Sequence, residues 1–162
     1  MGDRDFGEFV DAKALVLRRT AYLLCGDWHR AEDLVQTALA KMYAVWPRIA
    51  KIGALDAYAR KVLVRAAIDE SRLASRRRET AVDAVPDWAG EDRDVAAHLD
   101  VRAALAALPP RQRAVVVLRY WEDLSIEETA QLLGCTTGTV KSQANKGLAA
   151  LRHQLEPAGE VR

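Results

Sequence analysis

Apolar residues recur along the first half of the chain with the spacing of amphipathic helices. They lie three or four positions apart in three successive segments, which is the repeat of one helical face. Asp27 has the chemistry of an N-cap for the second segment, which we expect to end at Trp46, before Pro47. We expect the third helix to run from about Leu55 to Ser75. The inner-face residues of the three segments are Phe6, Phe9, Val10 and Leu17; Ala31, Leu34, Val35, Ala38, Leu39 and Met42; and Tyr58, Val62, Leu63, Ala66 and Ile68.

Four shorter helices are predicted in the second half. Pro109 and Pro110 stop the first of them, and Ser125 followed by Glu128 has the pattern of a capping box. The four segments span about residues 95–107, 111–121, 125–133 and 137–155. Because no segment alternates apolar and polar residues as a strand does, the sequence predicts an all-α fold.

Charge divides the chain more sharply than the net value of +1 suggests. Residues 48–78 carry nine basic and three acidic side chains, a net +6, whereas residues 79–100 carry one and seven, a net −6. The acidic stretch contains Pro86 and Gly90 and has little periodicity, which is typical of an exposed flexible linker. The predicted organisation is a helical domain over residues 1–78, a linker over 79–97, a second helical domain over 98–156 and a tail over 157–162.

Several classes of protein are disfavoured. No apolar run approaches the eighteen or so residues of a membrane span, and the acidic N-terminus lacks a secretory signal, so we expect a cytoplasmic protein without membrane insertion. Cys25 and Cys135 stand alone and are interpreted as buried small hydrophobes. Glu127 and Glu128 lack evident partner carboxylates, and the three histidines lack ligand spacing. We therefore expect no metal, no cofactor and no enzymatic activity.

The stretch from residue 134 to 147, "GCTTGTVKSQANKG", has the glycines, hydroxyls and lysines of a phosphate-binding loop. A Walker loop needs a lysine directly after its last glycine and a strand before the loop, and Lys141 and the preceding helical segment fit neither. A helix-turn-helix fits better, because Gly134 suits the left-handed turn and Thr136 or Thr137 suits the next N-cap. The inner faces of its two helices would be Ile126, Ala130 and Leu133, and Val140, Ala144, Leu148, Leu151 and Leu155.

The outer face of the second of these helices is polar, and no acidic residue occurs from 136 to 155. Asparagine can pair with adenine, and lysine with guanine or a phosphate, so this face predicts DNA contact. A second basic cluster, which contains Arg72 and Arg76 to Arg78, indicates either a phosphate or acidic-partner surface or a solvated helix end that complements the helix dipole. The predicted DNA-reading residues are Thr139, Lys141, Ser142, Gln143, Asn145 and Lys146.

Three long stretches cover most of the two predicted domains: "RTAYLLCGDWHRAEDLVQTALAKMYAVW", "DAYARKVLVRAAIDESRLASRRR" and "LPPRQRAVVVLRYWEDLSIEETAQLLGCTTGTVKSQANKGLAALR". In their order and spacing they resemble the sigma-70 family, specifically the extracytoplasmic-function (ECF) group and its actinobacterial SigE-like members. The resemblance implies a region 2 bundle and a region 4 helix-turn-helix that read the minus-10 and minus-35 promoter elements. The chain departs from the family's usual residues at Arg65, Gln143, Lys146 and the run "ESRLASRRR", so the resemblance does not fix the promoter sequence.

The resemblance also implies roles for residues of the first domain. Glu32, Asp33, Gln36 and Thr37 would contact core RNA polymerase, although Glu32 and Asp33 also suit first-turn acids that complement the helix dipole. The implied minus-10 residues are Tyr58, Arg60, Lys61, Arg65, Arg72 and Arg76.

These roles describe a sigma factor that binds core RNA polymerase and directs promoter recognition, local DNA melting and transcription initiation. The expected partners are core RNA polymerase, promoter DNA and, as a further candidate, an anti-sigma factor, and the free protein is expected to be a monomer. The alternative is a stand-alone helix-turn-helix regulator with an N-terminal oligomerisation domain, which would bind a palindrome as a dimer.

Overall fold

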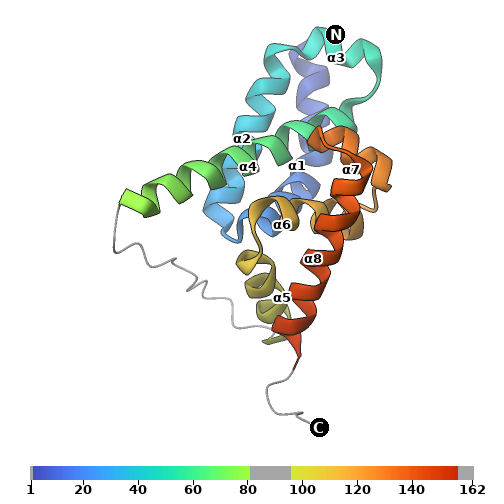
Figure 1. Ribbon diagram of the computed structural model, residues 1–162. Coiled ribbons are helices and arrows are strands. Elements are labelled where there is room, and N and C mark those ends of the chain that lie inside the picture. Colours follow the sequence, from blue (N-terminus) through green and yellow to red (C-terminus); the bar gives the residue numbers. More distant parts are fainter. Residues whose placement is uncertain (1, 81–95, 157–162) are drawn as a thin grey trace. The chain divides into compact units, whose positions relative to one another are not determined.

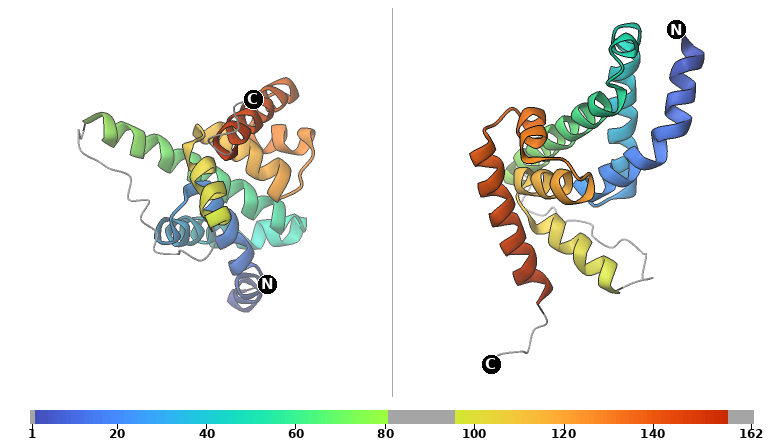
Figure 2. Two further views of the ribbon diagram at one scale, coloured as in Figure 1. Left: turned by 90° about the horizontal axis from the view of Figure 1, so that it is seen from below. Right: turned by 90° about the vertical axis from the view of Figure 1, so that its right-hand side faces the viewer.

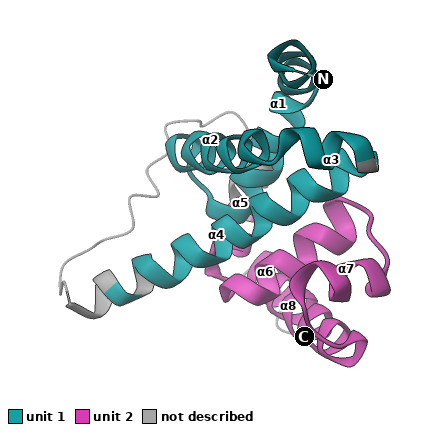
Figure 3. Cartoon of the chain, turned by 90° about the horizontal axis from the view of Figure 1, so that it is seen from above, with its two compact units in different colours: residues 1–86 teal, residues 87–162 magenta. Residues whose placement is uncertain are grey.

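The computed structural model describes residues 2–80 and 96–156. Contacts between Cα atoms divide the chain into two compact units, residues 1–86 and 87–162 (Figure 3). The described residues form helices and turns and no strand, so the predicted all-α fold class is confirmed. Most of the predicted linker, residues 81–95, and the predicted tail lie outside the described residues.

The first unit is built on three long helices that pack against one another, with a short fourth helix beside them (Figure 1). The core lies between the long helices and is formed by residues such as Met42, Leu63 and Val64, which are fully buried. The helices are α1 (Asp3–Cys25), α2 (Trp28–Ala44), α3 (Trp46–Ile52) and α4 (Leu55–Thr80). Because each long helix contacts the other two, all three share one core.

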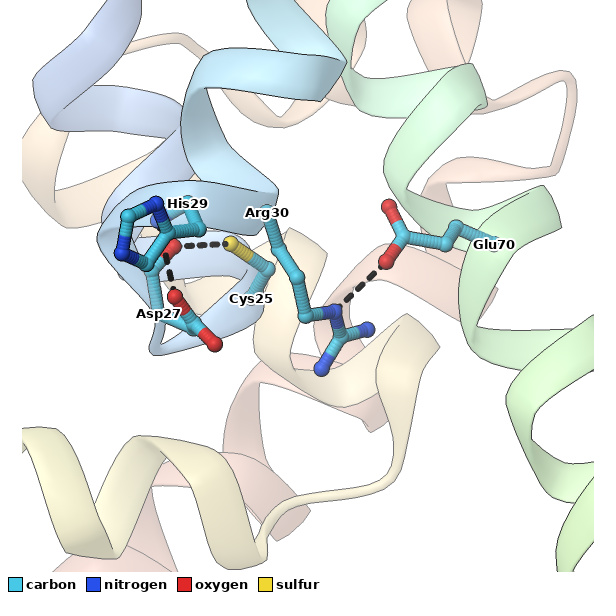
Figure 4. A network of polar contacts seen from close by, with 5 residues as sticks. All are labelled: Cys25, Asp27, His29, Arg30 and Glu70. Carbon is cyan, nitrogen blue, oxygen red and sulfur yellow. Dashed lines mark hydrogen bonds and ion pairs between the residues drawn. The ribbon is translucent and has the colours of Figure 1, made fainter. Parts of the chain in front are cut away.

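Helix α2 begins where the sequence predicts, directly after the end of α1. Gly26 adopts a left-handed conformation with φ 79° that ends α1. The Asp27 side chain accepts a hydrogen bond from the backbone N–H of His29 at 2.8 Å, which confirms the N-cap (Figure 4). The thiol of Cys25 donates to the Asp27 carbonyl oxygen at 3.3 Å in the same turn.

The predicted end of the second helix at Trp46 is wrong. Helix α2 ends at Ala44, and Trp46 is the first residue of α3. Pro47 therefore lies in the first turn of a helix, where its missing N–H would have no intrahelical acceptor in any case. The next helix, α4, also continues past Ser75 to Thr80.

An ion pair links each of the three long helices of this unit to each of the other two. The Arg30 to Glu70 pair is the shortest, with Nε and Oε1 2.6 Å apart and about a third of each side chain accessible (Figure 4). The three pairs are Lys13 with Asp56 between α1 and α4, Arg18 with Glu32 between α1 and α2, and Arg30 with Glu70 between α2 and α4. Partly buried pairs constrain geometry more than fully solvated ones do.

The second unit is a bundle of shorter helices gathered around the C-terminal helix. Its elements are α5 (Ala96–Ala107), α6 (Pro110–Val116), a π-helical turn η1 (Val117–Trp121), α7 (Ile126–Leu133) and α8 (Thr137–Leu155). Helix α8 contacts α5, α6 and α7, and the right-hand view of Figure 2 shows α5 and α8 beside each other. A small core of Val115, Ala130, Val140 and Ala144 joins α6, α7 and α8.

Three expectations for this unit need correction. The segment predicted as a single helix over 111–121 begins at Pro110 and changes its hydrogen-bond pattern at Val117, where it becomes π-helical. Cys135 is only half-buried. Leu155, predicted on the inner face, is 42% exposed because it is the last residue of α8.

Candidate functional site

The turn between α7 and α8 has the geometry of a helix-turn-helix. Ser125 and Glu128 form the predicted capping box at the start of α7. Gly134 ends α7 in a left-handed conformation with φ 67°, and the N–H of Cys135 donates to the Ala130 carbonyl oxygen at 3.0 Å. Thr136 then caps α8 by accepting from the N–H of Thr139 at 3.1 Å. Local chemistry thus sets both ends of the turn.

Packing against the rest of the unit determines which side of α8 faces solvent. Val140, Ala144 and Gly147 are buried. The predicted DNA-reading residues that are exposed are Thr139, Lys141, Ser142, Asn145 and Lys146. They form one accessible polar surface, the α8 face, although the Thr139 hydroxyl also lies 2.9 Å from that of Thr136.

Gln143 differs from the other predicted DNA-reading residues. Its side chain is half-buried, and its Oε1 atom is buried without a hydrogen-bond donor in the described part of the protein. A buried carbonyl oxygen without a donor is unfavourable by about 1 to 3 kcal/mol. The structure therefore does not present Gln143 Oε1 on the α8 face, and base contact through this oxygen would require the side chain to rotate outward.

Most of the predicted minus-10 residues lie along one side of α4. At 100° per residue, Lys61, Arg65, Arg72 and Arg76 fall within an arc of about 60°. Arg65, Arg72 and Arg76 are exposed, and Lys61 is half-buried. Tyr58 falls on the same side and is half-buried. We call the four cationic residues the α4 stripe.

Arg60 does not join the α4 stripe. It falls on another side of the helix, is half-buried and has an interaction within the protein. Two exposed cations that the predictions did not single out, Arg48 and Lys51, lie on α3, which packs against α4. The signal that could have indicated them is the high positive charge of residues 48–78.

The predicted polymerase-binding residues lie on the exposed side of α2. Asp33, Gln36 and Thr37 are exposed, whereas Glu32 is half-buried and pairs with Arg18. Because α2 begins at Trp28, Glu32 and Asp33 fall after its first turn, where the field of the helix dipole has declined. The interpretation of these acids as first-turn complements of the dipole is therefore not supported.

Aromatic side chains hold both ends of α2 against α1. At the first end, Trp28 stacks on Tyr22 with ring centroids 3.8 Å apart. At the other end, Tyr43 packs on Phe6 with centroids 5.1 Å apart, and its hydroxyl donates to Asp3 at 2.7 Å. The hydrogen bond to the Asp3 carboxylate raises the pKa of Tyr43. Helix α2 is thus held against α1 at both ends.

The described residues contain no group of three or more His, Cys, Asp or Glu side chains placed to hold a metal ion. Burial raises the pKa of the Cys25 thiol to about 11, which disfavours the reactive thiolate at neutral pH. Among the described helices, none combines the length and apolarity needed to cross a bilayer.

Two family models match the chain. The model of sigma-70 region 2 matches residues 9–78, and the model of sigma-70 region 4 matches residues 98–151. The RNA polymerase sigma-E factor of Streptomyces avermitilis is 41% identical over 155 residues, which cover 94% of this chain and 86% of that protein. The chain belongs to the sigma-70 family.

Further relatives support its place in the ECF group. The ECF sigma factor SigL of Mycobacterium tuberculosis is 36% identical over 162 residues, which cover 94% of this chain and 89% of that one. A solved structure of the sigma factor RpoE of Bartonella quintana in complex with the anti-sigma factor NepR superposes with a TM-score of 0.74 at 25% identity, covering 96% of this chain and 99% of that one.

As an ECF sigma factor, the protein binds core RNA polymerase and directs promoter recognition, local DNA melting and transcription initiation. A region 2 match throughout most of the first unit disfavours a stand-alone helix-turn-helix regulator, whose N-terminal domain would only oligomerise.

Proposed function

We propose that three surfaces of this sigma factor each contact a different target. The α8 face contacts the minus-35 element, the α4 stripe contacts the minus-10 strand, and Asp33, Gln36 and Thr37 of α2 contact core RNA polymerase. The observation that carries this proposal is that each surface is exposed and lies on a helix whose opposite side is packed into a core.

The chemistry of the α8 face supports major-groove contact. Asn145 can form a bidentate pair with adenine, and Lys141 and Lys146 can contact guanine or phosphate. The described α8 carries no acidic residue from Thr137 to Leu155, so no carboxylate on the helix repels the DNA backbone. Thr139 and Ser142 add hydroxyl groups that can donate or accept.

The α4 stripe supports contact with a strand backbone. Lys61, Arg65, Arg72 and Arg76 extend along α4 on one side, so they can follow successive phosphates, and Arg48 and Lys51 of α3 extend the positive surface. Unstacking a base costs on the order of a few kcal/mol, and capture of the flipped base offsets this cost. The expected log-log salt slope is roughly −0.9 for each phosphate contacted in duplex DNA.

Further assignments follow from the same proposal. The protein acts in the cytoplasm as a monomer when free, and it promotes initiation by binding, without a catalytic step of its own. An anti-sigma factor is a candidate partner, because a sigma factor that is 25% identical was solved in complex with one.

Two single substitutions test the division of labour. Lys146→Ala should weaken binding to a minus-35 duplex and leave association with core polymerase unchanged, because Lys146 lies on the α8 face. Asp33→Arg should do the reverse, because it places a cation on the polymerase-facing side of α2. Binding is measured by fluorescence anisotropy for the duplex and by competition with labelled wild-type protein for core polymerase of a Streptomyces host.

Run-off transcription should fall with both variants, so the two binding measurements are what separate the roles. Equal loss of both kinds of binding in Lys146→Ala, or undiminished polymerase binding by Asp33→Arg, would overturn the assignment. Circular dichroism of each variant checks that its fold is retained.

A further inference from the structure

The corner where α1 meets the start of α2 holds an ordered group of side chains. The planes of Tyr22 and Trp28 are 6° apart, so the two rings stack face to face. The Arg18 Cζ atom lies 5.1 Å from the centroid of the Trp28 ring, and Arg18 Nε lies 2.8 Å from Glu32 Oε1. The guanidinium is therefore held from two directions, by an aromatic face and by a carboxylate.

This arrangement changes what Glu32 can offer a partner. Its carboxylate is neutralised by Arg18, and a cation that approached it would also meet the like charge of the guanidinium. Arg18 can still donate hydrogen bonds to a partner, because a guanidinium carries five N–H donors in a planar fork and the ion pair uses the one on Nε. The Arg18 side chain is 44% accessible, so a partner can reach it.

We propose that Arg18 makes the contact with core RNA polymerase at this corner, donating to a carboxylate or backbone carbonyl of the polymerase, and that Glu32 is a positioning residue that holds Arg18. This inference rests on the proposed polymerase surface of α2, which it extends onto α1. Holding a long side chain in place before binding reduces the conformational entropy lost on binding. Trp28 also helps to hold the guanidinium in place, because Arg18 Cζ lies over the face of its ring.

A direct role for Glu32 makes the opposite prediction. If the Glu32 carboxylate itself bound a polymerase cation, removal of Arg18 would free that carboxylate and would leave or increase the affinity. If Glu32 acts through Arg18, removal of either residue has the same consequence, and removal of both adds nothing. A double-mutant cycle therefore separates the two mechanisms.

The experiment measures the affinity of the full-length protein for core RNA polymerase of a Streptomyces host. Arg18→Ala, Glu32→Ala and the double variant should each lose affinity by about tenfold, the size expected for one charge-assisted hydrogen bond. Arg19→Ala is the matched control, because it removes the same charge from the next position of α1 and should change affinity less than twofold. Binding to a minus-35 duplex should stay unchanged in every variant.

A charge exchange separates positioning from simple stabilisation of the fold. Arg18→Glu combined with Glu32→Arg rebuilds the ion pair with its charges reversed, so the unfolding temperature should stay close to that of the wild type. Polymerase affinity should remain low, because the group presented to the polymerase now has the wrong charge. Recovered affinity in this variant would show that only the intramolecular ion pair matters, and would overturn the proposal.

The remaining outcomes are also decisive. Undiminished affinity in Arg18→Ala, additive losses in the double variant, or an equal loss in Arg19→Ala each contradict a contact made by Arg18 and positioned by Glu32. Asp33→Arg distinguishes failure of this inference from failure of the α2 surface. If Asp33→Arg abolishes binding while the Arg18 variants do not, only the inference fails, and if Asp33→Arg binds normally, the α2 surface itself is wrong.

Discussion

Gly147 of α8 lies so close to Val116 of α6 that a Cβ atom on the glycine would stand 2.8 Å from Val116 Cγ2. Carbon atoms without a bond between them do not approach this closely without strain, so the separation of the two helices requires a residue without a side chain. The same Cβ atom would lie 3.6 Å from the backbone oxygen of Gln112, which is ordinary van der Waals contact, so the strain would arise at Val116. The helix that carries the α8 face thus packs directly against α6.

Gly147→Ala should destabilise the second unit by about 1 to 3 kcal/mol, the usual cost of overpacking a core. Thermal unfolding followed by circular dichroism measures the change. Val116→Ala in the same chain should recover part of the loss, because it removes the atom that the new Cβ meets. Losses that simply add in the double variant would contradict the proposed contact.

Gly138→Ala is the matched control in the same helix. A Cβ at Gly138 would meet only the Thr136 hydroxyl oxygen, at 3.8 Å, which is ordinary contact. Because glycine is less favourable than alanine within a helix by up to about 1 kcal/mol, this substitution should be neutral or mildly stabilising.

Arg113 closes the C-terminal end of α5. Its Nε atom donates to the Leu105 carbonyl oxygen at 2.8 Å, and its Nη2 atom donates to the carbonyl oxygens of Ala106 and Leu108 at 2.8 Å each. Arg113→Met should lower the free energy of unfolding by about 1.5 to 3 kcal/mol, because it leaves helix-end carbonyl groups without a donor. Urea denaturation measures the loss, and hydrogen exchange should speed up in α5. The exposed Arg111, changed to Met, should have little effect.

Arg30 and Glu70 should be more strongly coupled than the surface pair of Lys13 and Asp56. The first pair is 2.6 Å apart with about a third of each side chain accessible, whereas the second is 3.4 Å apart and 41% and 61% accessible. Double-mutant cycles of unfolding free energy should give about 1 kcal/mol for the first pair and less than about 0.5 kcal/mol for the second. Similar values for both pairs would show that partial burial is not what matters here.

Cys25 should make stability fall at alkaline pH. Burial raises the pKa of its thiol from 9.0 to about 11, so the folded state holds the proton more tightly than the unfolded state. The resulting contribution to stability is fully present below about pH 9 and is lost as the pH rises to about 11, and it amounts to on the order of 2 kcal/mol. Unfolding free energies from urea titrations across this range should fall less for Cys25→Ala than for the wild type. Parallel curves for the two proteins would contradict this explanation.

Patterns within a few residues were enough to predict the helix-turn-helix. The capping box at Ser125, the left-handed Gly134 and the cap at Thr136 all depend on neighbours in sequence, which is why the sequence locates the start of α8 at Thr137. The cap at Asp27 was predicted for the same reason. The end of α2 was not predicted correctly, because a proline such as Pro47 is acceptable both after a helix and in the first turn of the next helix. Tertiary contacts determine which of the two occurs.

In the candidate sites, too, local sequence patterns predict some features and miss those that depend on tertiary packing. Helical periodicity indicates that Asn145 and Lys146 are exposed, and the structure agrees. Periodicity does not indicate that the Gln143 Oε1 atom is buried or that Glu32 pairs with Arg18. Gln143 lies on the flank of α8, where a flexible side chain can turn either way, and Arg18 comes from a different helix.

The sequence by itself determined the helical class, the helix-turn-helix and the family of this protein, because helix periods, caps and motif spacing are written in residues near one another. Only the tertiary structure decided which charges are paired and which remain accessible. The reason is that an ion pair such as Arg18 with Glu32, or a close approach such as Gly147 to Val116, depends on how separate helices pack. That packing arises from the whole core and from no single segment.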